Sequence, residues 1–208
     1  MYKASPPLKD LGLLNPSRAA FFMCDMQEKF RPAMIHFDEI VSVAKKMVEV
    51  SKVMSIPLVV TEQYPRGLGK TVPDIDISKA LIVVSKTRFS MLVPDVERLL
   101  HSLCDGILES VVLFGIETHI CVEQTAIELL SRNLKVHIIA DACTSRNNAD
   151  RLLALDRLRQ IGCFVTTSET VIFKILQDKD NPKFAEIRHL VKEPSPYTGL
   201  FPGSYAKM

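Results

Sequence analysis

The residue best placed for nucleophilic chemistry is a cysteine that follows a glycine turn and begins an amphipathic segment. The apolar run 111–114 stops at Gly115, a polar turn follows, and Cys121 then precedes apolar residues at helical spacing. A thiol in the first turn of a helix lies near unpaired backbone N–H groups and the positive end of the helix dipole, and both favour the thiolate. The alternative interpretation is an inert core cysteine, because free cysteines are usually buried.

An acid and a lysine stand at the ends of two other apolar runs. Asp25 follows the run 19–24, and Lys86 follows the run 80–85. Ligands of open parallel sheets bind at the carboxyl ends of the strands, so we expect these side chains and Cys121 to converge on one pocket, with Asp25 and Lys86 leaving adjacent strands. Taken singly, Asp25 could cap a loop and Lys86 could be a solvated surface charge.

The elements that would position these residues alternate along the chain. Short apolar runs, typical of buried parallel strands, occupy residues 19–24, 57–61, 80–85, 110–114, 135–140 and 163–167. Helical periodicity marks residues 40–54, 122–130, 152–161, 171–176 and 184–191. The pattern predicts an α/β fold: a single-domain, doubly wound, Rossmann-like parallel sheet of about six strands with helices on both faces. We place this domain at residues 1–192 and a Pro/Gly-rich C-terminal tail at residues 193–208.

Composition excludes several classes of protein. The chain has 208 residues, 47% of them hydrophobic and 24% charged, with a net charge of +2. This nearly balanced charge does not indicate binding to nucleic acid or to an anionic membrane surface. Five widely spaced cysteines without a C-x-x-C pair argue against a disulfide framework or a structural zinc site. The N-terminus lacks a signal-peptide pattern, and no apolar run approaches membrane-spanning length. We therefore expect a cytoplasmic protein with no nucleic-acid or membrane partner.

Three motifs in a fixed order resemble those of the isochorismatase-like cysteine hydrolase superfamily, and especially its eukaryotic isochorismatase-domain-containing members. They span roughly residues 18 to 170 and read Asp25-Met26-Gln27-x-x-Phe30, Lys86, and Gly115-x-x-Thr118-x-x-Cys121-Val122. The resemblance implies a catalytic triad of Asp25, Lys86 and Cys121. It also implies a cis peptide bond between Ile116 and Glu117, which would aim the backbone N–H groups of Glu117 and Cys121 at a substrate oxygen. Thr118 would support that turn.

The chemistry that such a triad suggests is hydrolysis of a C–N bond in a small amide or related metabolite. Cys121 would attack the carbonyl carbon to form a thioester, and Asp25 would transfer the proton. Members of the superfamily that bind a metal carry histidines after the second strand, whereas the sequence here reads Glu62-Gln63-Tyr64-Pro65-Arg66. We therefore expect no metal and no cofactor.

Three other functions compete with this one. Isochorismatases cleave a vinyl ether by acid-assisted hydrolysis without a cysteine nucleophile, and a non-catalytic or regulatory binding protein could keep the same fold. A ribonuclease role, a label attached to some members of the eukaryotic subgroup, is disfavoured because the sequence shows no basic patch and no histidine pair for phosphodiester cleavage.

The substrate is expected to be a small molecule in a largely apolar pocket. The residues that would line the pocket are Phe30, Tyr64, Phe89, Thr118 and Ile120. Arg88 and Arg146 are candidate anchors for a substrate carboxylate.

Three further expectations concern the whole molecule. We expect a homo-oligomer, a dimer or tetramer, with the tail residues Leu200, Phe201 and Tyr205 docked on their own or a neighbouring subunit. The final Ala206-Lys207-Met208 resembles a variant of the peroxisomal tripeptide, which gives a peroxisome-type organelle as the alternative to the cytoplasm. Because strand-exit residues contribute little to a core, substitutions of the triad should leave the protein folded.

Overall fold

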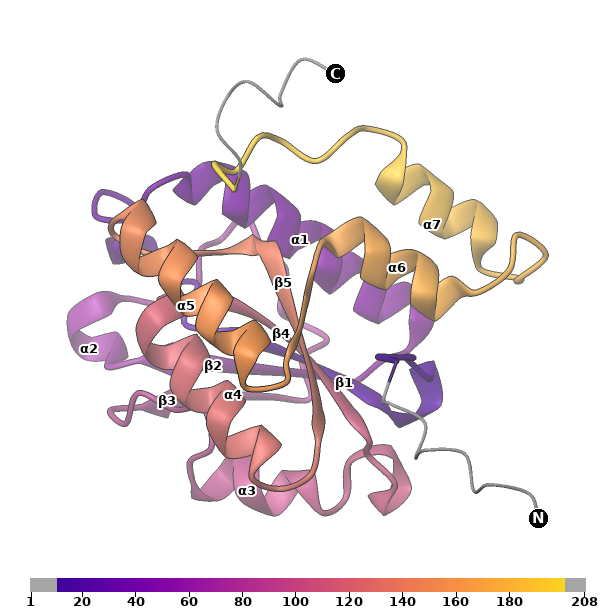
Figure 1. Cartoon of the computed structure of the whole chain (residues 1–208), viewed down its shortest axis with the longest axis horizontal. Helices are drawn as coiled ribbons and strands as arrows, with labels where there is room; N and C mark the ends of the chain where they lie inside the picture. The colour runs from indigo at the N-terminus through magenta and orange to yellow at the C-terminus, as the bar shows by residue number, and fades with distance from the viewer. Residues whose placement is uncertain (1–10, 201–208) are drawn as a thin grey trace, which may run out of the picture.

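The computed structural model describes residues 11–200, which form a six-stranded parallel sheet between two layers of helices (Figure 1). The strands are β1 (Ala19–Cys24), β2 (Leu58–Gln63), β3 (Ile82–Lys86), β4 (Ser110–Ile116), β5 (Lys135–Thr144) and β6 (Phe164–Thr166). Their order in the sheet is β3-β2-β1-β4-β5-β6, and every neighbouring pair is parallel. The predicted α/β fold class is confirmed.

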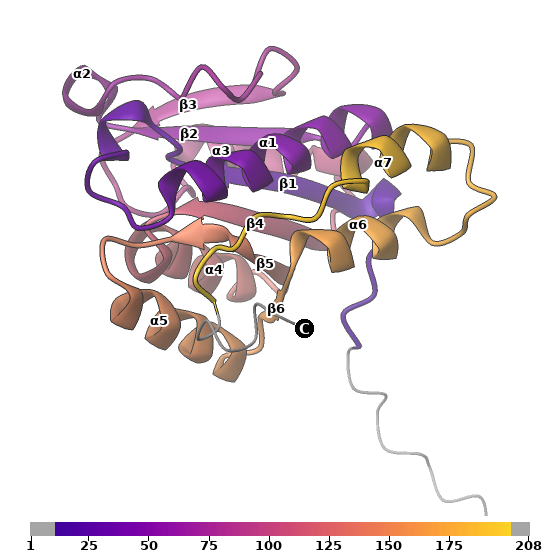
Figure 2. The same ribbon diagram turned by 90° about the horizontal axis from the view of Figure 1, so that it is seen from above.

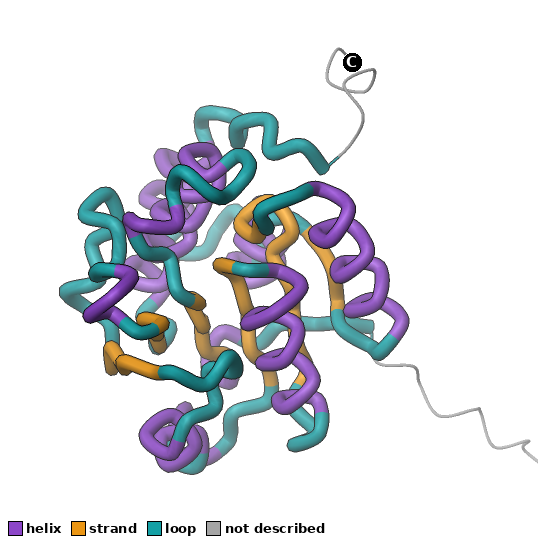
Figure 3. The backbone as a smooth tube through the Cα atoms, turned by 90° about the vertical axis from the view of Figure 1, so that its left-hand side faces the viewer, coloured by secondary structure: helices purple, strands orange, loops and turns teal. Residues whose placement is uncertain are grey.

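Helices cover both faces of the sheet, as Figures 1 and 2 show. They are α1 (Phe37–Met54), α2 (Pro65–Leu68), α3 (Pro94–Leu100), α4 (Glu123–Leu130), α5 (Asn148–Gln160), α6 (Ser168–Leu176) and α7 (Phe184–Val191). Helices α1, α6 and α7 pack together on one face, and α4 and α5 pack on the other. Figure 3, seen from the left-hand side of Figure 1, shows the strands between these layers. No helix within residues 11–200 has the length and hydrophobicity needed to cross a bilayer.

Three strands extend at least two residues beyond their predicted ends. We expected β2 to stop at Thr61, β4 before Gly115 and β5 at Ala140, but they run to Gln63, Ile116 and Thr144. The two strands resume pairing after a register shift between Leu113 and Gly115. Asp141 looked like a loop residue, yet it is buried in β5, because it accepts hydrogen bonds from the backbone N–H and hydroxyl of Ser168 at the start of α6.

The described part of the tail, residues 193–200, lies against its own domain. The ammonium of Lys46 in α1 donates to the Ser195 hydroxyl at 3.1 Å, and the fully buried Arg151 of α5 donates to the Thr198 carbonyl. Leu200 packs against the core. Phe201, Tyr205 and the Ala206-Lys207-Met208 tripeptide lie outside the described residues.

Gly115 allows β4 to approach β1 closely. Its φ of +127° disfavours L side chains, and a Cβ built at this position would lie 2.1 Å from the Cys24 carbonyl oxygen. This carbonyl belongs to the last residue of β1, directly before Asp25. Gly115 therefore holds the end of β1 against the strand that leads to Cys121.

Gly115→Ala should lower the free energy of unfolding by about 1–3 kcal/mol, because the new methyl group overlaps a backbone carbonyl that cannot move away without disturbing β1. The matched control is Gly162→Ala, because Gly162 has a φ of +104° but no atom within 4 Å of its built Cβ. The free energies of unfolding of the two variants are measured in urea. Both variants carry the cost of a positive φ, and only Gly115→Ala also carries the cost of the steric clash. Equal losses in the two variants would contradict the close-approach role of Gly115.

Candidate active site

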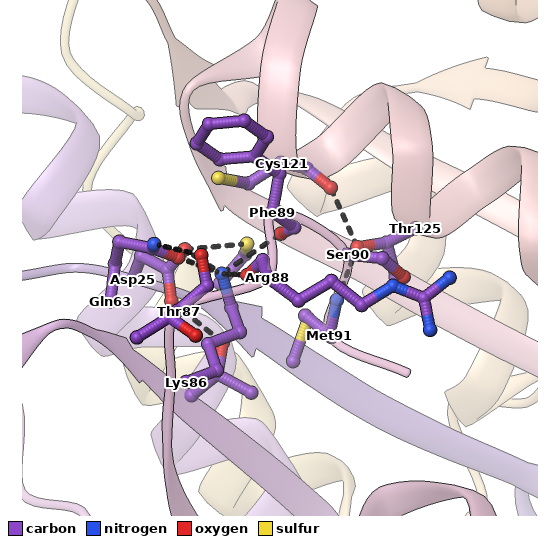
Figure 4. A network of polar contacts seen from close by, with 12 residues as sticks. Asp25, Gln63, Lys86, Thr87, Arg88, Phe89, Ser90, Met91, Cys121 and Thr125 are labelled. Atoms are coloured by element: carbon purple, nitrogen blue, oxygen red, sulfur yellow. Dashed lines mark hydrogen bonds and ion pairs between the residues drawn. The ribbon is translucent and has the colours of Figure 1, made fainter. Parts of the chain in front are cut away.

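The structure brings Asp25, Lys86 and Cys121 together at the carboxyl edge of the sheet (Figure 4). Asp25 directly follows β1, Lys86 is the last residue of β3, and Cys121 lies in a π-helical turn, Thr118–Val122, between β4 and α4. A carboxylate oxygen of Asp25 and the Cys121 sulfur lie within 4.8 Å of each other. The expectation that Asp25 and Lys86 leave adjacent strands is wrong, because β2 lies between β1 and β3. The lysine spans β2 to reach Asp25.

Asp25 and Lys86 form a buried ion pair. The Lys86 Nζ lies 2.6 Å from the Asp25 Oδ2, and the two side chains are 0% and 1% exposed. The ammonium also donates to Gln63 Oε1 at 2.6 Å and to the Phe89 carbonyl at 2.8 Å. Burial by itself lowers the pKa of Lys86, but attraction to neighbouring acidic groups, including the hydrogen-bonded Asp25 carboxylate, outweighs it and raises the pKa above the ordinary value. Lys86 is therefore a permanent cation that attracts a Cys121 thiolate.

A turn at the end of β1 fixes the Asp25 carboxylate. Asp25 has a φ of +51°, so the alternation of side chains along β1 ends at this residue. Its Oδ1 accepts a hydrogen bond from the Thr61 hydroxyl at 2.8 Å, and Thr61 is the β2 residue in register with Cys24. Thr61 and Lys86 thus hold one carboxylate oxygen each.

Two glutamines hold the lysine in place from the β2 side. Gln63 is the β2 residue in register with Lys86. Its backbone N–H donates to Gln27 Oε1 at 2.7 Å, and Gln27 Nε2 donates back to the Gln63 carbonyl at 2.9 Å. Gln27 is fully buried. This pair positions the amide oxygen that receives the Lys86 ammonium.

The turn that carries Cys121 is fixed at both ends. The Ile116–Glu117 peptide bond is cis, at the position that the family resemblance implies. The Glu117 carbonyl accepts from the backbone N–H of Ile120 at 3.1 Å, and the Cys121 carbonyl accepts from the Thr125 hydroxyl at 2.6 Å. This arrangement sets the direction of the peptide groups around the sulfur.

The Glu117 side chain faces Arg146 rather than the triad. Its carboxylate accepts three hydrogen bonds from the Arg146 backbone and guanidinium, at 2.7 to 3.1 Å. Burial works to raise the pKa of Glu117, but these bonds outweigh it and lower the pKa below 4.5. The pair ties the cis peptide to the loop that precedes α5.

The predicted pocket residues have different environments. Tyr64 and Phe89 are 54% and 51% exposed, and Phe30 and Ile120 are partly buried. Thr118 is fully buried and donates to the Thr144 carbonyl at 2.9 Å, so it supports the turn and offers no surface to a substrate. In Figure 4 the Phe89 ring lies on the same side of the network as the Cys121 sulfur.

The two candidate carboxylate anchors already have acidic partners. Arg88 pairs with Glu128 at 2.6 Å, and Arg146 pairs with Glu117. His119 lies against the Ser145 hydroxyl, at 3.0 Å from Nδ1. Both arginine side chains are more than half exposed, so their role as carboxylate anchors stays a prediction.

Sequence reasoning missed Cys24 as a member of this site. The Cys24 sulfur lies 3.5 Å from Asp25 Oδ2 and within 4.8 Å of the Cys121 sulfur. Burial raises the pKa of the Cys24 thiol well above its usual range, and the neighbouring Cys121 and Asp25 raise it further. Cys24 is therefore a protonated thiol. Its place directly before Asp25 was the only sequence signal, and strand alternation pointed it away from the site.

Within residues 11–200, Cys24, Asp25 and Cys121 form a group whose ligand atoms lie close enough together to hold a metal ion. A cation there would compete with the Lys86 ammonium for Asp25 Oδ2 and with Thr61 for Oδ1. It would also need the Cys24 thiol to lose its proton against a raised pKa. These residues do not fit a resident metal ion.

Known proteins share both the sequence and this architecture. Residues 19–170 match the isochorismatase domain family. The chain is 47% identical to isochorismatase domain-containing protein 1 of Danio rerio over 190 residues, which are 91% of this chain and 66% of the relative. It is 51% identical to isochorismatase domain-containing protein 2 of Bos taurus, with 91% of each chain covered.

A solved structure is similar over nearly the whole described region. It is that of the MAR1 ribonuclease from Caenorhabditis elegans, with a TM-score of 0.86 and 41% identity, covering 91% of this chain and 97% of the other. The suspected relation to isochorismatase-domain-containing proteins is confirmed. The chain spans 66% of the Danio rerio relative, slightly less than two thirds of its length.

Lys86→Ala should lower the free energy of unfolding by about 3–5 kcal/mol, because it leaves the Asp25 charge buried without its partner. The burial of Asp25 and Lys86 corrects the premise that strand-exit residues contribute little to the core. The control is Lys183→Ala, whose ammonium is half exposed in an ion pair with Glu186 and should cost less than about 1 kcal/mol. Similar urea midpoints for the two variants would contradict a buried ion pair.

The Glu117–Arg146 pair should be lost in acid. Because folding lowers the pKa of Glu117 from 4.5, the carboxylate stabilises the fold above that pH and loses this effect as the pH falls through its folded pKa. The difference in melting temperature between wild type and Glu117→Gln should therefore be constant near neutral pH and shrink below pH 4.5. Glu186→Gln, at an exposed ion pair, is the control and should show little difference at any pH.

Proposed function

Because the chain belongs to the isochorismatase domain family, we propose that it is a cysteine hydrolase that cleaves a C–N bond of a small amide. The observation that carries this proposal is the grouping of a thiol, a carboxylate and an ammonium. The Cys121 sulfur lies within 4.8 Å of the Asp25 carboxylate, which the Lys86 ammonium holds at 2.6 Å.

The reaction follows from the roles of the three groups. Asp25 accepts the thiol proton of Cys121, and Lys86 stabilises the resulting thiolate by its charge. The thiolate attacks the carbonyl carbon, Asp25 returns the proton to the amine as the C–N bond breaks, and a thioester remains on Cys121. Water, deprotonated by Asp25, then hydrolyses the thioester and releases the acid.

Backbone N–H groups of the turn stabilise the oxyanion in this proposal. The backbone N–H groups of Ile120 and Val122 donate to the Glu117 carbonyl, and the N–H groups of Glu117 and Cys121 in the same turn are the proposed donors to the substrate oxygen. Phe30, Tyr64, Phe89 and Ile120 remain the proposed lining for the rest of the substrate.

Vinyl-ether hydrolysis is the alternative reaction for the same site. Asp25 would protonate the substrate, and Cys121 would be dispensable. Both reactions need Asp25 to carry a proton beside the Lys86 ammonium, so the ion pair does not distinguish between them.

RNA hydrolysis is a second candidate because of the name of the Caenorhabditis elegans structure. Phosphodiester cleavage would require groups that stabilise a doubly charged phosphorane. Near the sulfur, the Lys86 ammonium is surrounded by protein acceptors, and Arg146 is paired with Glu117. Assaying one preparation on RNA and on amides, with Cys121→Ala in parallel, distinguishes this activity from a contaminating nuclease.

Two properties of the whole molecule are also proposed. A dimer or tetramer would cover the exposed apolar residues Leu81 and Val83 at the edge strand β3. The protein is proposed to act on a small molecule in the cytoplasm, or in a peroxisome-type organelle if the C-terminal tripeptide is recognised.

Cys121→Ala should abolish hydrolysis of the amide substrate, and Asp25→Asn should slow it at least about a hundredfold, the scale of a positioned acid–base group. The substrate is found by screening wild type against small amides, ureas and enol ethers. Cys163→Ser, which changes another buried thiol away from the site, is the matched control and should keep full activity. Rates are compared at a temperature at which circular dichroism shows every variant folded.

Native alkylation provides a test that needs no substrate. Iodoacetamide should modify Cys121 before the other cysteines if it is the nucleophile, and a metal chelator should leave both alkylation and turnover unchanged. Full activity of Cys121→Ala would contradict the thioester route. Absence of both fast alkylation and hydrolysis would favour a non-catalytic binding protein.

A further inference from the structure

Two thiols lie side by side at the site, and the proposed hydrolytic reaction uses only one. The sulfur atoms of Cys24 and Cys121 lie within 4.8 Å of each other and of an Asp25 carboxylate oxygen. A disulfide bond needs the two sulfur atoms to come closer together than they are here. Rotation about the Cα–Cβ bonds of the two cysteines moves the sulfur atoms far enough to close this distance. Cys24 is fully buried, whereas Cys121 is 7% exposed, so a small reagent from solvent reaches Cys121 first.

The charges around the two sulfurs give them different chemical roles. Cys121 is the thiol of the pair that solvent reaches, and the Lys86 ammonium lies nearby to balance the charge of a thiolate, the form that a hydroperoxide oxidises. Burial and Asp25 keep Cys24 protonated, so it does not react with the oxidant itself. One cysteine is thus suited to be oxidised and the other to react with the product.

We propose that Cys24 and Cys121 form a reversible disulfide bond when a hydroperoxide oxidises Cys121, and that this modification protects and silences the site. The proposal concerns regulation of the residue that the proposed function uses as nucleophile, and to that extent it rests on that function.

The reaction has two balanced steps. The Cys121 thiolate attacks one oxygen of hydrogen peroxide, the O–O bond breaks, and a sulfenic acid forms with release of hydroxide, which takes up a proton as water. The Cys24 sulfur then attacks the Cys121 sulfur, while its proton passes to Asp25 Oδ2, 3.5 Å away. The sulfenic hydroxyl leaves with that proton as a second water, and the S–S bond forms. Two equivalents of an external thiol reduce the bond and restore both cysteines.

The consequence of the pairing is protection against irreversible oxidation. A sulfenic acid without a neighbouring thiol reacts further with peroxide to the sulfinic acid, which ordinary thiols do not reduce. At this site, the Cys24 thiol is close enough to react with the Cys121 sulfenic acid. This reaction competes with oxidation of the sulfenic acid by a second peroxide molecule.

The test uses the full-length protein, hydrogen peroxide and peptide mass spectrometry. After peroxide treatment and alkylation under denaturing conditions, wild type should yield a Cys24–Cys121 cross-linked peptide that dithiothreitol removes. Cys24→Ser should instead accumulate sulfinic acid on Cys121, which dithiothreitol does not reverse. Cys163→Ser is the matched control and should give the wild-type cross-link. Cys24→Ala provides a second variant if the serine variant fails to fold by circular dichroism.

The result that overturns the inference is sulfinic acid on Cys121 of wild type, with Cys24 still available for alkylation after denaturation. This outcome is distinct from failure of the proposed function, because iodoacetamide would still label Cys121 quickly in the native protein and turnover would be intact. Absence of fast Cys121 labelling would instead contradict the proposed function and this inference together.

Discussion

The interaction on which the site depends is the buried ion pair between Asp25 and Lys86. Removing two charges from water costs several kcal/mol for each ion, and only close contact and additional hydrogen bonds offset that cost. The structure supplies them from two elements: β2, through Thr61 and Gln63, and the loop after β3, whose Phe89 carbonyl faces the ammonium. The carboxylate beside Cys121 is therefore held by the sheet itself.

The sheet order explains why these groups meet. β1 lies at the centre, between β2 and β4, so the end of β1 faces residues from both neighbours. Thr61 approaches Asp25 from the β2 side, and Gly115 allows β4 to come close from the other side. The same closeness brings the turn of Cys121 within reach of both Asp25 and Cys24. The paired thiols are a consequence of how closely β1 and β4 pack.

Much of this could be predicted from the sequence, because strong hydrophobic patterns carry information about regular elements. The six strands, helix α1 and the convergence of Asp25, Lys86 and Cys121 follow from apolar runs and from the position of ligand sites in parallel sheets. The cis peptide came only from the family resemblance, since no local pattern encodes it.

The remaining details depend on contacts between distant residues. Cys24 was missed because alternation predicts that it points away from Asp25, whereas the φ of +51° at Asp25 changes the direction of the chain. The end of β5 was misplaced because Asp141 is polar, and its burial depends on Ser168 in a later helix. The burial of Lys86 was missed because its partners, Gln63 and the Phe89 carbonyl, become neighbours only through strand register and loop closure.

The charge of the site also bears on the kind of substrate it can accept. When Asp25 accepts the Cys121 proton, the Lys86 ammonium balances the charge of the thiolate, and this thiolate lies next to the place where bond cleavage would occur. A phosphodiester would bring a second negative charge there, and the guanidinium of Arg146 is already paired with Glu117. A neutral amide brings no charge until the oxyanion forms, and rigid backbone N–H groups can stabilise that oxyanion without reorganising. The electrostatic balance around the ion pair therefore favours a neutral acyl group over an anionic phosphate as the reacting group.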